Sequence, residues 1–141
     1  MRLLARREHT RRELATKLAP HVETPEELQA LLDDFTARGW LSEARFVDQV
    51  VRMKCARLGP ARIRRELLER GVSEELMGPA LATLRQSELV HARSVWARKF
   101  RTPADNSEGR ARQVRFLQSR GFSVEVAMRV VRSGGEEGSD D

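Results

Sequence analysis

Residues 59–81 read GPARIRRELLERGVSEELMGPAL, and residues 109–131 read GRARQVRFLQSRGFSVEVAMRVV. The two stretches align without gaps at an offset of 50 residues, and identical residues recur from Gly59/Gly109 to Glu75/Glu125. Each stretch contains an Arg-Gly-hydrophobic triplet, in which the glycine supplies the left-handed residue that ends a helix. We therefore interpret the chain as an internal repeat of about 50 residues.

Helical spacing of apolar residues continues on both sides of this repeat. A third triplet, Arg38–Trp40, ends an earlier helical segment, and RRELATKL at residues 11–18 echoes residues 64–71 more weakly, at an offset of 53. Aromatic and β-branched runs are too few for a sheet. The sequence predicts an all-α fold of about eight helices. The expected helices cover or begin at residues 2–18, 25–39, 43, 60–70, 74, 87–100, 109–120 and 123–131.

Grouping the expected helices in threes from the N-terminus predicts tandem three-helix repeats. Repeat 1 covers residues 1–58, repeat 2 covers 59–100, and a truncated repeat 3 covers 101–132. Each repeat is too small to hold a large core alone, so neighbouring repeats must stack. Residues 133–141, SGGEEGSDD, hold four acids and no apolar residue, so we expect a disordered acidic tail.

Several protein classes are excluded by composition. The chain has 141 residues, and no run approaches the roughly 18 apolar residues of a membrane span. Charges interleave the first residues, which excludes a secretory signal. The single cysteine, Cys55, excludes a disulfide framework and fits the reducing cytoplasm. We expect a cytoplasmic protein without a membrane segment.

No arrangement of residues suggests catalysis. His9, His21 and His91 are scattered and lack the spacing of metal ligands. Neither of the glycine-rich phosphate-binding motifs, GxxxxGK(S/T) and GxGxxG, occurs. Cys55 lies near the basic residues Lys54 and Arg57, but a structural cysteine is the simpler interpretation. We expect no enzyme activity, no cofactor and no metal site.

The charge balance favours an acidic partner. The formal net charge is +5, and it rises to +9 when the four acids of residues 133–141 are set aside. Nucleic acid or an acidic protein surface would complement such a chain. Of the 26 basic residues, 23 are arginine, whose guanidinium suits phosphate and carboxylate recognition, although genomic composition bias would give the same count.

One arginine pair recurs at equivalent positions in the repeat. Arg62 and Arg65 lie within about 60° of each other on the helix, roughly opposite the apolar face, and Arg112 and Arg115 occupy the matching positions. The alternative is that these arginines only form a solvated face that keeps the protein soluble. The candidate partner- or DNA-binding residues are Arg62, Arg65, Arg70, Arg93, Arg98, Lys99, Arg112 and Arg115. A helix-turn-helix DNA reader is disfavoured, because the second helix would begin with Glu74 and Glu75.

Four segments, in this order, resemble the RecX family of RecA regulators. They are LLARREHTRRELATKL, GWLSEARFVDQVVRMKCARLGPARIRRELLERGV, VWARKF and RARQVRFLQSRGFSVEVAMRVV. The resemblance covers nearly the whole chain apart from the acidic tail. It implies tandem three-helix repeats in an elongated, curved body. It also implies binding in the groove of the RecA filament on DNA, inhibition of recombinase and co-protease activities, and no cofactor.

The sequence thus leaves three functions to weigh. The favoured one is a monomeric, non-enzymatic regulator that binds the RecA–DNA filament through an arginine-rich face. The second is a sequence-independent DNA-binding protein of the same architecture, for single- or double-stranded DNA. The third is a helical-repeat module for an unrelated acidic protein.

Overall fold

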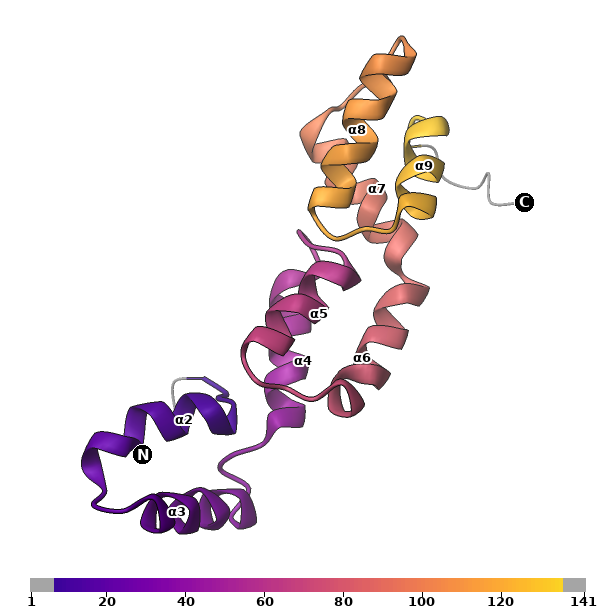
Figure 1. Cartoon of the computed structure of the whole chain (residues 1–141). Coiled ribbons are helices and arrows are strands. Elements are labelled where there is room, and N and C mark those ends of the chain that lie inside the picture. The colour runs from indigo at the N-terminus through magenta and orange to yellow at the C-terminus, as the bar shows by residue number, and fades with distance from the viewer. Residues whose placement is uncertain (1–6, 136–141) are drawn as a thin grey trace.

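The computed structural model describes residues 7–135, which form eight α-helices and no strand (Figure 1). The helices are α2 (Arg11–Leu18), α3 (Pro25–Ala37), α4 (Glu43–Lys54), α5 (Pro60–Glu69), α6 (Glu74–Gln86), α7 (Glu88–Lys99), α8 (Ser107–Ser119) and α9 (Val124–Arg132), with a 3-10 turn at Ala19–His21. The predicted all-α fold is confirmed. Within the described residues, no helix has the length and apolar character needed to cross a membrane.

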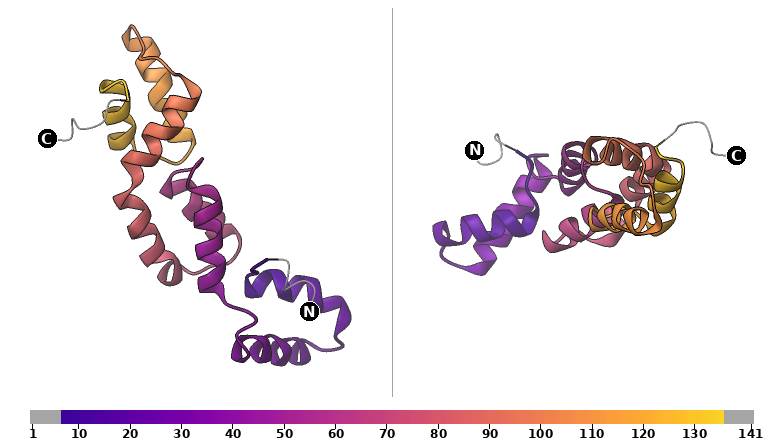
Figure 2. Two further views of the ribbon diagram at one scale, coloured as in Figure 1. Left: turned by 180° about the vertical axis from the view of Figure 1, so that it is seen from behind. Right: turned by 90° about the horizontal axis from the view of Figure 1, so that it is seen from above.

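The helices stack into an elongated, curved array, as the family resemblance implied. The N-terminal helices lie at one end and α8 and α9 at the other, with α4, α5 and α6 between them (Figures 1 and 2).

Local sequence signals set where the helices begin and end, at the positions predicted. Ser42 and Ser73 each accept a hydrogen bond from a backbone N–H in the first turn of the following helix. Gly71 and Gly121 have φ of +90° and +98°, in the left-handed region that the Arg-Gly triplets predicted. The predicted internal repeat is therefore present as recurring helix ends.

Three hydrophobic clusters divide the array into three units. Unit 1 is α2 with α3, built around Leu14, Leu18, Leu32, Phe35 and Leu41. Unit 2 is α4, α5 and α6, built around Phe46, Val47, Ile63, Leu67, Val72, Met77, Leu81 and Leu84. Unit 3 is α7, α8 and α9, built around Ala92, Val95, Trp96, Leu117, Phe122, Ala127, Val130 and Val131.

These clusters correct the predicted repeat boundaries at residues 59 and 101. The boundaries cut through units 2 and 3, because α4 shares its core with α5 and α6, and α7 shares its core with α8 and α9. Phe46 of α4 and Trp96 of α7 are both buried, and they lie 50 residues apart. The alignment revealed the period of the repeat, whereas its phase depends on which helices bury their apolar faces together.

The predicted N-terminal helix is also too long. Residues 7–10 are not helical, and Thr10 caps α2 in a reciprocal pair with Glu13. Thr10 and Gly59 are both N-caps, and Leu14 and Ile63, four residues after them, are both buried. In the repeat, α2 therefore corresponds to α5 at an offset of 49 residues, not 53. The rest of the predicted helix, residues 1–6, lies outside the described residues.

The predicted acidic tail begins three residues too early. Ser133 caps α9, and the N–H groups of Gly134 and Gly135 donate to the carbonyls of Val131 and Val130. These residues form the C-terminal cap of α9 and are not part of an extended tail, because Gly134 and Gly135 have positive φ and turn the chain back onto the helix. Residues 136–141, which carry the four acids, lie outside the described residues.

Candidate partner-binding surface

The outer face of α8 presents two of the predicted arginines. Arg112 and Arg115 are exposed, and they lie opposite Gln113 and Leu117, which are buried against the rest of unit 3. Among the described residues, neither guanidinium pairs with a carboxylate. Both arginines are therefore available to an acidic partner.

Arg112 also lines a surface hollow at the start of α8. The hollow measures about 490 Å³ and is also lined by Lys99. The ammonium group of Lys99 lies 5.4 Å from the ring centroid of Phe116, so the ring holds this cation in place. Asp105 also lines the hollow and partly offsets the two positive charges.

The pair on α5 divides between two roles. Arg65 is exposed and, within the described residues, has no acidic partner. Arg62 instead donates from Nη1 to the carbonyl of Ser119, at 3.1 Å, across to unit 3. Ser119 lies one turn beyond Arg115, so this bond brings the Arg62 guanidinium to the end of the arginine face of α8.

We call the contact between units 2 and 3 the second joint, and its centre is backbone on backbone. The N–H of Gly59 donates to the carbonyl of Arg120 at 2.7 Å, and the N–H of Ala61 donates to that of Gly121 at 3.1 Å. A Cβ on Gly59 would lie 2.5 Å from the carbonyl carbon of Gly121. Only glycine permits this approach.

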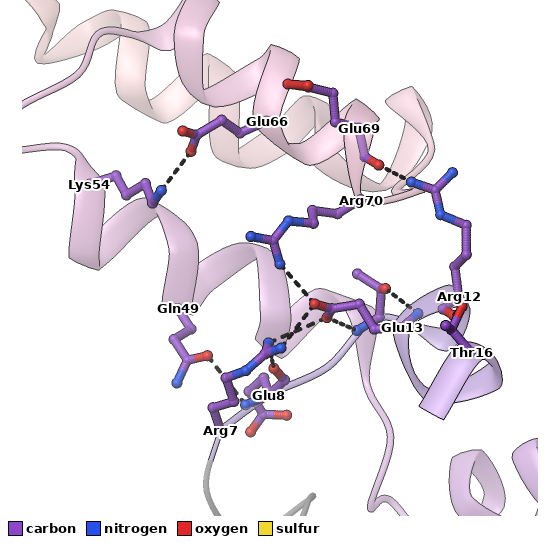
Figure 3. Close-up of polar contacts among 11 residues, drawn as sticks. Arg7, Glu8, Arg12, Glu13, Thr16, Gln49, Lys54, Glu66, Glu69 and Arg70 are labelled. Carbon is purple, nitrogen blue, oxygen red and sulfur yellow. Dashed lines mark hydrogen bonds and ion pairs between the residues drawn. The ribbon is translucent and has the colours of Figure 1, made fainter. Parts of the chain in front are cut away.

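The first joint, between units 1 and 2, is made by charged side chains (Figure 3). Arg70 donates to Glu13 at 2.8 Å, and Arg7 donates to the same carboxylate at 2.9 Å. Arg12 donates to the carbonyl of Glu69. Arg70, a predicted partner-binding residue, is thus already paired within the chain.

The electrostatics of Glu13 follow from this position. Partial burial opposes its ionisation, but the hydrogen bonds from Arg7 and the Thr10 backbone and the charges of Arg7 and Arg70 outweigh it. Together they lower the pKa of Glu13 to about 2. The carboxylate is ionised throughout the neutral range and holds both arginines.

The predicted residues of α7 lie on more than one side of the helix. Arg98 donates to the carbonyl of Ala56, which ties unit 3 to the turn between α4 and α5. Arg93 is half-buried and engaged within the protein. Lys99 alone among them faces the hollow beside Arg112. The structure therefore brings Lys99 and Arg112 to one hollow, with Arg115 one turn further along α8. It holds Arg62, Arg70 and Arg98 in contacts between units.

Two arginines that the prediction omitted, Arg110 and Arg132, flank the far side of α8. Arg110 begins the segment RARQVRFLQSRGFSVEVAMRVV. Helical spacing alone does not show that α9 packs beside this face of α8. The described residues contain no group of histidine, cysteine or acidic side chains arranged to hold a metal ion.

The comparisons with known proteins agree with this arrangement. Residues 42–81 match the model of the second three-helix domain of RecX, and residues 86–131 match that of the third. The chain is 50% identical over 141 residues to the regulatory protein RecX of Leptothrix cholodnii, covering all of this chain and 90% of that protein. The chain belongs to the RecX family.

Other RecX proteins support the same assignment. The RecX protein of Ralstonia nicotianae is 45% identical over 130 residues, which cover 92% of this chain and 81% of that protein. A crystal structure of a regulatory protein RecX superposes with a TM-score of 0.75 at 20% identity, covering 93% of this chain and 68% of the other. That structure confirms the RecX fold of the array, and the matched domains coincide with units 2 and 3.

Proposed function

We propose that this RecX-family chain is a non-enzymatic regulator that binds the RecA–DNA filament and inhibits its recombinase and co-protease activities. It would act as a monomer in the cytoplasm. Support comes from membership of a family whose curated members are named regulatory proteins. The elongated, curved array suits a partner that is itself extended and helical.

A single observation carries the binding role. Arg65, Arg112 and Arg115 extend exposed guanidinium groups that have no carboxylate partner among the described residues, and Arg65 and Arg115 occupy equivalent positions of units 2 and 3. A filament of protein on DNA offers both carboxylates and phosphates to such groups. We assign partner contact to these three residues and to Lys99. Arg62, Arg70, Arg93 and Arg98 would act indirectly, by holding the shape of the array.

The test is single-stranded-DNA-dependent ATP hydrolysis and strand exchange by RecA, with and without the protein. Wild type should inhibit both. The variant R65E/R112E/R115E changes the formal net charge from +5 to −1, and it should fold, because surface substitutions usually alter stability by within about 0.5 kcal/mol each. We expect it to lose inhibition by at least about tenfold in concentration.

A matched variant separates position from net charge. R52E/R57E/R85E makes the same charge change at three other exposed arginines. It should retain most of the inhibition. Equal loss in both variants would show that total charge, and not the proposed residues, governs binding, and full inhibition by the first variant would refute the assignment.

A second candidate, sequence-independent DNA binding, is favoured by the same unpaired arginines, since guanidinium groups also pair with phosphates. It predicts that bare single-stranded DNA binds as tightly as the filament. It also predicts a steep loss of affinity for bare DNA as salt is raised, through counterion release. The favoured proposal expects tighter binding to the filament than to bare DNA at every salt concentration.

A further inference from the structure

Between α8 and α9 lies a groove of about 360 Å³ with an apolar floor. Ala111 and Val114 form its α8 wall, and Met128 and Val131 form its α9 wall. Met128 is 42% exposed, and Val124, one turn earlier on α9, is 46% exposed. The apolar strip along α9 is therefore open to solvent.

The matching face of unit 2 is built differently. At an offset of 50, Val114 and Val124 of unit 3 correspond to Arg64 and Glu74 of unit 2, which form an ion pair. Met128 corresponds to Gly78, which has open space around it. The same fold can therefore present a polar surface here, and its apolar character in unit 3 is not required by packing.

Three arginines surround the groove. Arg110, Arg115 and Arg132 all line it and are all exposed. None pairs with a carboxylate among the described residues, and Arg132 contacts only the carbonyl of Met128 in its own helix. An occupant must therefore combine apolar side chains with negative charge.

Three occupants fit poorly. Nucleic-acid bases stack on aromatic rings, and the lining residues include none. A second copy of the chain would bring two sets of three arginines together. The chain's own C-terminal sequence GEEGSDD has acids but no apolar side chain for the floor.

We propose that the α8–α9 groove binds a segment of a partner protein in which acidic residues flank apolar ones. The apolar side chains pack on Val114, Met128 and Val131, and the carboxylates pair with the arginines at the edge. The inference rests on the proposed function only in one respect, namely that RecA would be the protein that carries the segment.

The first experiment measures fluorescence anisotropy with a labelled amphipathic peptide that has leucines three and four residues apart between glutamates. Wild type should bind it. V114R/V124E transplants the ion pair of unit 2 without changing net charge, and should weaken binding by at least about tenfold. The milder M128S should weaken it in the same direction and serves as the test if the double variant does not fold.

Two controls identify the cause of any loss. L68E/V90R replaces two apolar residues exposed elsewhere, again without a change in net charge, and should bind within about twofold of wild type. A peptide with serines in place of the leucines should not bind. Equal binding of the serine peptide, or of the leucine peptide to wild type and to both groove variants, would overturn the proposal.

The second experiment repeats the wild-type and V114R/V124E comparison on RecA–DNA filaments and on bare single-stranded DNA. Weaker binding to filaments with unchanged binding to bare DNA is expected, and equal weakening on both would overturn the choice of a protein segment. Because the peptide experiment contains no RecA, failure of wild type to inhibit RecA would refute the proposed function while the peptide result still decides the groove.

Discussion

The two joints connect successive units with different chemical groups. At the first joint, the N-cap of α2 is Thr10, whose N–H donates to Glu13 of its own helix at 3.0 Å. At the second joint, the N-cap of α5 is Gly59, whose N–H donates to the carbonyl of Arg120 in the next unit. The N-cap N–H of α2 is thus satisfied within its own helix, and the next N–H, that of Arg11, donates to the Glu43 side chain of unit 2 at 3.1 Å. The N-cap N–H of α5 is satisfied by the backbone of the next unit.

This difference sets how each joint is held. Without a side chain at Gly59, the two backbones touch and exchange hydrogen bonds. With Thr10 capping α2, the contacts across the first joint involve side chains instead: the ion pairs Glu13–Arg70 and Glu8–Arg45, and hydrogen bonds such as that from Arg12 to the carbonyl of Glu69. The ion pairs are partly exposed and screened by salt. We expect the first joint to open at a lower free energy than the second.

The largest effect should come from Gly59→Ala. The added Cβ would meet the Gly121 backbone, which cannot move without breaking the joint, so we expect a loss of about 2–3 kcal/mol in unfolding free energy. Urea denaturation measures this loss. Gly78→Ala is the control, because open space surrounds Gly78 inside α6, and it should stabilise the protein by about 0.5–1 kcal/mol. Wild-type stability of Gly59→Ala would show that the joint adapts.

A smaller effect is expected from Glu13→Gln, which leaves Arg7 and Arg70 without their shared carboxylate. We expect a loss of about 1–2 kcal/mol. Hydrogen exchange should show the loss in unit 1 and not in unit 3. Asp34→Asn removes an exposed ion pair with Arg38 within α3 and should change stability by less than about 0.5 kcal/mol.

The acid dependence of Glu13→Gln gives a second check. Since folding lowers the pKa of Glu13 from 4.5 to about 2, its contribution is present above pH 4.5 and is lost as pH falls toward 2. The variant should therefore show a flatter decline in stability over this range. An unchanged slope would mean that Glu13 does not carry the acid sensitivity of the first joint.

The smallest effect concerns His9, which is buried just before α2 with its Nδ1 unpartnered. Burial, followed by the charges of Arg7 and Lys17, lowers its pKa below 6.5. Its neutral form favours folding above pH 6.5, and that contribution is lost as pH falls below this value. Hydrogen exchange at pH 7 and pH 5 should show unit 1 loosening while unit 3 does not, and His9→Gln should abolish the difference.

Local signals in the sequence predicted most of the secondary structure. Ser42 and Ser73 as caps and Gly71 and Gly121 as helix ends depend only on nearby backbone, so they could be identified without a structure. The repeat boundaries could not be predicted, because a period of 50 residues fits any starting point. The burial of Phe46 and Trp96 within their units decided the phase.

The same division holds for the candidate surface. Exposure of Arg65, Arg112 and Arg115 follows from helical spacing opposite buried residues, which the sequence by itself determines. The partners of Arg62 and Arg70 lie in other units, 57 residues away along the chain in each case. The stacking of the units decided that these two guanidinium groups hold the array together. Helical spacing shows only that an arginine points away from the core of its own unit, and this is the same whether it meets solvent or a neighbouring unit.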